Sequence, residues 1–173
     1  MTNSRFPFTA DIFAILPLTD AKVWQFLNAY VDREVLDNRV PVRALRKLSN
    51  PGSGRPWTEP RYAGLSEAVK DGLASNDYQS FQLPSGVSDY RRVILAFCDD
   101  GYVIFGLAFD AETPDKQLVS HLDSLMVEVG GVCGAVLDET AAPLNMADFL
   151  NARGSRLCRH FICRSHPPES SGI

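Results

Sequence analysis

The chain has 173 residues, of which 45% are apolar and 22% are charged, a composition typical of one globular domain with a sizeable core. Its net charge of −4 argues against a general nucleic-acid-binding protein, which needs a basic excess to displace counterions from phosphates. No apolar run approaches about 18 residues, and the first ten residues lack the apolar core of a signal peptide after Arg5, so we expect neither membrane insertion nor export, and a cytoplasmic location.

The N-terminal part predicts a strand followed by a helix. Residues 11–16 are an apolar run that stops at Pro17, which is typical of a buried strand. Thr19 or Asp20 can then cap a helix whose apolar residues recur at helical spacing to about Glu34. Residues 42–48 favour a shorter basic helix after Pro41.

A long loop is expected at residues 49–64, because prolines and glycines interrupt any periodicity there. The loop contains Trp57 and Tyr62, which either pin it to the core or anchor a binding surface. Residues 65–73 suit a short helix, and residues 78–83 suit an edge strand that ends at Pro84.

Residues 91–110 predict a β-hairpin around which the rest of the chain is organised. Two apolar segments flank Asp100 and Gly101, a pair suited to a tight reversal with positive φ. Both faces of the two strands are apolar, so helices should cover the sheet on at least one side.

The second half predicts a helix over 113–130 that ends at Gly130, a strand over 132–138 and a short helix from Met146. We therefore expect an α+β fold with a mainly antiparallel sheet built on the 91–110 hairpin, two long helices on one face, and a ferredoxin-like (split βαβ) tendency. Residues 1–153 would form one domain, and residues 154–173 a basic segment with a disordered end.

Few residues carry obvious chemistry. The ligand types that zinc prefers lie in one stretch, at Cys158, His160, Cys163 and His166, but without a second pair of ligands, so the simpler interpretation is a strand or tail without metal. The four cysteines lack a framework spacing, so we expect reduced thiols, with Cys133 a buried structural one. No cofactor motif is present, and we predict no cofactor.

Two phrases, Asp-Gly-Tyr-Val-Ile-Phe-Gly at 100–106 and Val-Leu-Asp-Glu-Thr-Ala-Ala-Pro-Leu at 136–144, underlie a resemblance to bacterial immunity proteins, which neutralise a cognate toxin by binding it. The resemblance is architectural and covers the second half of the chain. It implies a non-enzymatic domain whose acidic residues meet a basic active-site surface on the toxin around aromatic anchors. The residues implied are Trp57, Tyr62, Asp99, Asp100, Asp110, Glu112, Asp138 and Glu139.

Two other classes stay open. A small-molecule-binding or enzymatic domain would place a pocket near Asp138 and Glu139, with His121 as a further candidate, although a packed histidine is the simpler interpretation at its position. A metal-stabilised interaction module would use the Cys158–His166 cluster. Convergence of the polar candidates on one cleft favours an enzyme, and their dispersal favours a binding protein. The identity of the partner and the oligomeric state stay undecided.

Overall fold

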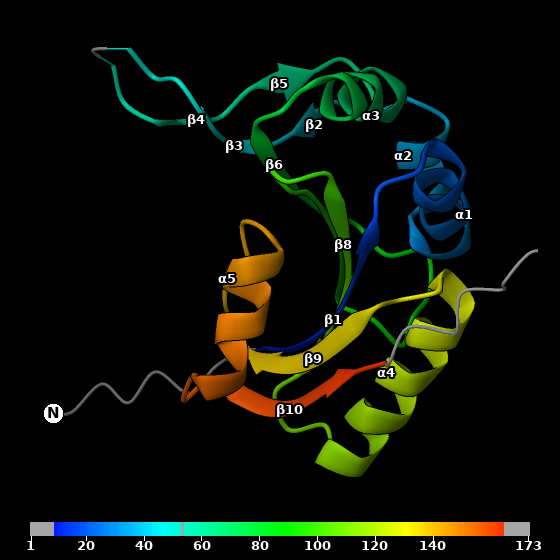
Figure 1. Ribbon diagram of the computed structural model, residues 1–173. Coiled ribbons are helices and arrows are strands. Elements are labelled where there is room, and N and C mark those ends of the chain that lie inside the picture. The colour runs from blue at the N-terminus through cyan, green and yellow to red at the C-terminus, as the bar shows by residue number, and fades with distance from the viewer. Residues whose placement is uncertain (1–8, 53, 165–173) are drawn as a thin grey trace, which may run out of the picture.

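One large antiparallel sheet dominates the computed structural model, which describes residues 9–52 and 54–164 (Figure 1). Its eight strands follow the order β10-β9-β1-β8-β7-β6-β3-β4, and each pairs with its neighbours in antiparallel fashion. The strands are β1 (Thr9–Pro17), β3 (Leu45–Lys47), β4 (Trp57–Thr58), β6 (Tyr78–Leu83), β7 (Arg92–Phe97), β8 (Tyr102–Asp110), β9 (Cys133–Asp138) and β10 (Cys158–Cys163). A separate two-stranded sheet pairs β2 (Val42–Arg43) with β5 (Arg61–Tyr62).

Five α-helices occur within the described residues, together with a short 3-10 turn at Ala152–Gly154. The α-helices are α1 (Asp20–Tyr30), α2 (Arg33–Leu36), α3 (Leu65–Ala74), α4 (Asp115–Val129) and α5 (Met146–Asn151). No helix in this part of the chain is both long and apolar enough to cross a membrane.

The predicted hairpin is confirmed as β7 and β8, with Gly101 at φ 84° in the turn between them. β8 lies between β7 and β1, so the hairpin occupies the middle of the sheet. Gly106 is required in β8 because a Cβ there would lie 2.7 Å from the ring of Phe13 on the neighbouring strand β1. The central strands are therefore fixed by turn chemistry and by close packing.

The two faces of the sheet carry separate hydrophobic clusters. One cluster joins the sheet to α1, α3 and α4, for example through Phe26, Val69 and Leu122. The other lies beneath α5, where Phe149 packs among residues of β1 and β9. Figure 1 shows α5 within the curve of the sheet, on the side opposite the larger helices.

Three sequence predictions were wrong in detail. Residues 42–48 form β2 and β3 instead of a helix, since Val42 and Ala44 are buried while Arg43 and Leu45 are exposed, which is the two-residue period of extended chain. α1 ends at Tyr30, so the helix does not continue to Glu34. β6 is an internal strand between β7 and β3 and not an edge strand.

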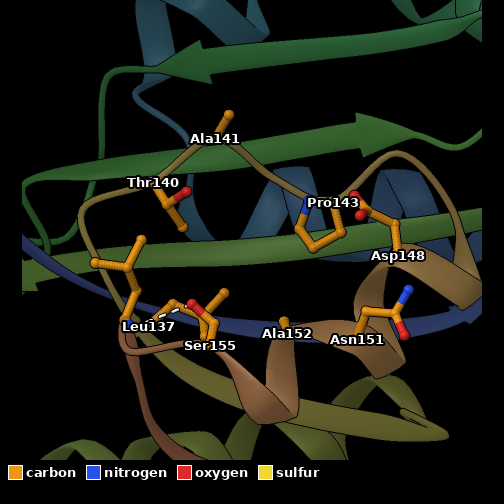
Figure 2. Close-up of a pocket in the computed structure, with 9 residues that line it drawn as sticks. Leu137, Thr140, Ala141, Pro143, Asp148, Asn151, Ala152 and Ser155 are labelled. Carbon is orange, nitrogen blue, oxygen red and sulfur yellow. Dashed lines mark hydrogen bonds between the residues drawn. The ribbon is translucent and has the colours of Figure 1, made fainter.

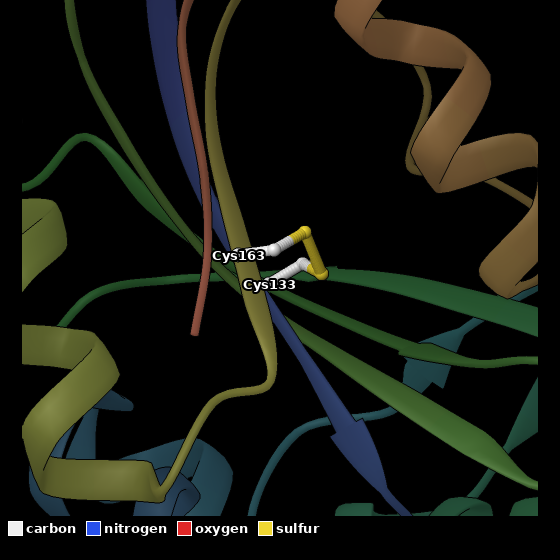
Figure 3. The surroundings of a disulfide bond; sticks show 2 residues. All are labelled: Cys133 and Cys163. Carbon is white, nitrogen blue, oxygen red and sulfur yellow. A yellow bond between two sulfur atoms is a disulfide. The ribbon is translucent and has the colours of Figure 1, made fainter. Parts of the chain in front are cut away.

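The basic C-terminal segment contributes β10 to the edge of the sheet. Cys163 lies directly opposite Cys133 on β9, and the two form a disulfide (Figure 3). The expectation of reduced thiols was therefore wrong for this pair, because strand pairing brings together two cysteines that are 30 positions apart in sequence. Cys98 and Cys158 are free. The predicted disordered end at 165–173 lies outside the described residues.

Candidate functional site

One part of the sheet is left bare by the helices. α5 covers the curved face over β1 and β9, but on the same face of β3, β4 and β6 every side chain except that of Tyr78 is exposed or half-buried. The β3–β4 hairpin projects beyond the body of the molecule on that side (Figure 1). We call this surface the open face, and its residues are Leu45, Lys47, Trp57, Glu59, Ser80 and Gln82.

Trp57 is the most prominent side chain of the open face. It keeps 42% of its surface exposed although it contacts two neighbours. Its ring stands edge-on to Tyr78 at 6.2 Å between centroids, and Lys47 Nζ lies 5.7 Å from the ring centre. Tyr78 is itself held, because its hydroxyl donates to the carbonyl of Ala142 at 2.7 Å, and burial raises its pKa to about 12. Trp57 is therefore a preorganised, solvent-facing aromatic.

A pocket of about 370 Å³ opens beside Leu45 on this face. Arg43 of β2 and Glu59, which follows β4, line one side, and β6 contributes Ser80 and Gln82. The segment Thr140–Ala142 forms the opposite wall.

A second pocket of about 260 Å³ lies behind that segment, against α5 (Figure 2). Thr140 and Ala141 line both pockets, so residues 140–142 form a partition between them. The sequence places a pocket near Asp138 and Glu139, but neither of these residues lines either pocket.

A buried acid and a half-buried arginine lie on the same face of the sheet, across the central strands. Asp11 is 0% exposed, and neither of its carboxylate oxygens has a hydrogen-bond partner. Arg92 Nη2 lies 3.9 Å from Asp11 Oδ2 and donates to the hydroxyl of Thr9 at 3.3 Å. Burial raises the pKa of Asp11 to about 6 in spite of the opposing charge of Arg92. Sequence reasoning missed this residue, although a lone acid in an apolar run was a usable signal.

Two of the predicted acidic residues accept hydrogen bonds from the N-terminal end of α5. Asp99 accepts a hydrogen bond from Asn145 Nδ2 at 3.2 Å, and Asp100 accepts one from the backbone N–H of Met146 at 2.8 Å. Both carboxylates therefore satisfy donors at the N-terminal end of a helix, where negative charge is favoured.

The other four acidic candidates lie near the Asp110 end of β8, away from the turn that holds Asp99 and Asp100. β8 is nine residues long, so it spans roughly 30 Å between the two ends. Asp110 forms an ion pair with Arg91, and Asp138 accepts from Arg159 Nε at 2.7 Å. Glu112 is exposed on the turn that follows, and the charge of Glu139 acts on Asp11. The six acids therefore form two separate groups and do not converge on one cleft.

Tyr62 is turned inward, unlike Trp57. Only 8% of its surface is exposed, and its single hydroxyl proton is shared between Asp71 and Oε1 of Gln79. Burial, together with the carboxylate of Asp71, raises its pKa to about 12. The two aromatic candidates thus differ: Trp57 faces solvent and Tyr62 anchors β5 to the core.

The metal-ligand candidates do not assemble. Cys163 is consumed by the disulfide, and the thiol of Cys158 contacts the carbonyl of His160 instead of another ligand. Within residues 9–52 and 54–164, no group of three or more metal-ligating side chains could hold an ion. His166 lies outside the described residues.

His121 lies on α4, with its ring centroid 4.8 Å from that of Phe109 and 6.0 Å from that of Tyr90. It packs against aromatic neighbours on the helical side of the sheet, away from both pockets.

Comparison of the chain with protein-family models, curated proteins and solved structures found no match.

Proposed function

We propose that this chain is a protein-binding domain that engages its partner through the open face, with Trp57 as the anchor. The observation that carries the proposal is a tryptophan that stays 42% exposed while Tyr78 and Lys47 hold its ring in place. Tryptophan is enriched among residues that dominate binding energy. A side chain that is already ordered loses little entropy when it is covered.

The distribution of polar groups supports a binding surface over an enzyme. Asp138 is paired with Arg159, and His121 packs on the other face of the sheet. The 370 Å³ pocket is lined by Arg43, Glu59 and Ser80, but no hydrogen bond or ion pair joins these three side chains, so no nucleophile is coupled to a base there. Surface recognition needs no such coupling.

Within this class we propose an immunity protein that neutralises a toxin in the cytoplasm. The strand order β9-β1-β8-β7, with α1 after β1 and α4 after β8, supports a ferredoxin-like core that adjoins the strands of the open face. Asp110 and Asp138 already form ion pairs within the chain, so pairing them with a toxin would first break existing contacts. Glu112 remains an exposed acidic candidate.

The test compares Trp57→Ala with Val127→Ala, an equally simple truncation of a 69% exposed side chain on α4. Each variant and the parent chain are immobilised and exposed to lysate of the native host, and captured proteins are quantified by mass spectrometry. We expect parent and Val127→Ala to enrich the same partner, and Trp57→Ala to bind it about 30-fold more weakly, as for a loss of about 2 kcal/mol at a hot spot.

The toxin assignment has its own readout. The captured partner is expressed with the parent chain or with Trp57→Ala, and we expect growth to be rescued by the parent alone. Equal capture by all three baits, with unchanged melting temperatures, would contradict the assignment of the open face. A captured partner that does not harm cells would contradict the immunity assignment.

A further inference from the structure

We infer that the partner segment which docks on the open face is an acidic stretch of polypeptide. This inference rests on the protein-binding function proposed above and specifies the chemistry of the partner. It follows from how charge is distributed along this chain and from which charges are paired.

Charge is strongly segregated. Residues 39–61 contain six cationic side chains against the single carboxylate of Glu59, a net charge of +5. Because the whole chain carries −4, the remainder carries −9. The cationic residues are Arg39, Arg43, Arg46, Lys47, Arg55 and Arg61.

These cations are also largely unpaired. Arg46 alone among them forms ion pairs, with Asp71 and Asp77; the other five have no carboxylate within 4.0 Å among the described residues. Among the described residues outside this stretch, ion pairs are formed by Arg33, Arg91, Arg92 and Arg159, but not by Arg153, Arg156 or Arg164. Two of the unpaired cations border the open face directly, because Arg43 lines its pocket and Lys47 lies over the ring of Trp57.

The pairing of β2 with β5 adds to this excess. Arg43 lies directly opposite Arg61, and both side chains are exposed. Like charges directly opposite each other on paired strands are unfavourable. A carboxylate bound between them would relieve the repulsion. Arg43 also lines the 370 Å³ pocket, so such a carboxylate would lie next to the apolar surface of Leu45.

Polypeptide fits this surface better than nucleic acid does. Glu59 lines the same pocket as Arg43, and its carboxylate would repel an evenly charged phosphate backbone. An acidic peptide can place carboxylates at Arg43 and Lys47 and apolar side chains against Leu45 and Trp57. The mixed apolar and cationic character of the open face matches that alternation.

The experiment uses the full chain and a short fluorescein-labelled oligo-glutamate peptide in which leucine alternates with glutamate, with the corresponding oligo-lysine peptide and oligodeoxythymidylate of equal length as comparison probes. Binding is followed by fluorescence anisotropy at about 0.01 M ionic strength, where the Debye length is about 30 Å, and again at about 0.15 M, where it is about 8 Å. The test variant is Arg43→Glu/Lys47→Glu. The matched control is Lys116→Glu/Arg156→Glu, which changes the net charge equally at exposed positions away from the open face.

We expect saturable binding of oligo-glutamate that weakens with salt, falls about tenfold or more in Arg43→Glu/Lys47→Glu and is kept by the control variant. Equal losses in both variants would overturn the inference, since net charge and not the cations at Arg43 and Lys47 would then govern binding. Tighter binding of oligodeoxythymidylate would overturn it in favour of nucleic acid. If oligo-glutamate does not bind while capture of a partner still depends on Trp57, the acidic chemistry is wrong and the binding function stands.

Discussion

Replacing the buried Asp11 by asparagine should remove a specific pH dependence of stability. The carboxyl is fully buried without a hydrogen-bond partner, and its pKa is raised from 3.8 to about 6. The folded state therefore holds the proton more tightly than the unfolded state. The stability that this group contributes is complete below about pH 4, is lost as the pH rises to about 6, and stays lost above that.

The size of the effect follows from the two pKa values. A difference of about two pKa units, at about 1.4 kcal/mol each, corresponds to a loss of about 3 kcal/mol between pH 4 and pH 7.5. An asparagine side chain cannot ionise, so the Asp11→Asn variant should gain about 3 kcal/mol relative to the parent chain over that interval. Arg92 keeps its hydrogen bond to Thr9 in the variant, and its side chain is 25% exposed, so the remaining charge is partly solvated.

Urea titrations at half-unit steps from pH 4 to pH 8 provide the measurement, with free energies of unfolding compared at each pH. Asp123→Asn, on the exposed side of α4, serves as the control and should follow the parent curve. If the curves of the parent and Asp11→Asn run parallel across the whole range, the carboxyl titrates alike in both states and the reasoning from burial is refuted.

Three further changes test the packing and the covalent link. Replacing Cys133 and Cys163 together by serine should cost about 3–4 kcal/mol, because the disulfide closes a loop of 30 positions; equal urea midpoints with and without reductant would show that the bond does not form. Gly106→Ala should cost about 1–3 kcal/mol, since its Cβ would meet the Phe13 ring at 2.7 Å, and an unchanged melting temperature would contradict this packing. Tyr62→Phe removes the hydroxyl and its hydrogen bonds, so its free energy of unfolding should fall by about 1–2 kcal/mol, measured by thermal melts. A stability equal to that of the parent would mean that these bonds add nothing.

Long, periodic elements were predictable from sequence. The hairpin at β7 and β8 combines two apolar segments with a turn that needs positive φ at Gly101. α4 follows from apolar spacing and from Gly130, which ends it at φ 68°. α5 follows from Asn145, whose side chain accepts from the N–H of Asp148. In each case local chemistry and burial favour the same conformation.

The short strands and the pairing of distant residues were not predictable. β2 and β4 have two residues each and β3 has three, too few to establish a period. The Cys133–Cys163 pair depends on the register of β10 against β9, which spacing along the chain does not reveal. The exposure of Trp57 likewise depends on the pairing of β3 with β6. Sequence alone could therefore not decide whether Trp57 anchors the loop to the core or faces solvent at a binding surface.

The disulfide has a mechanical consequence. The disulfide closes a ring between Cys133 and Cys163. A force applied to the two ends of the chain is transmitted across this bond, so the 30 positions between the cysteines, roughly 100 Å of extended chain, bear no load. α5 and the partition at 140–142 lie inside this ring. When the oxidised protein is unfolded by force, the chain outside the disulfide should extend, while the loop that contains α5 adds nothing to the extended length. Reduction of the disulfide should then increase that length.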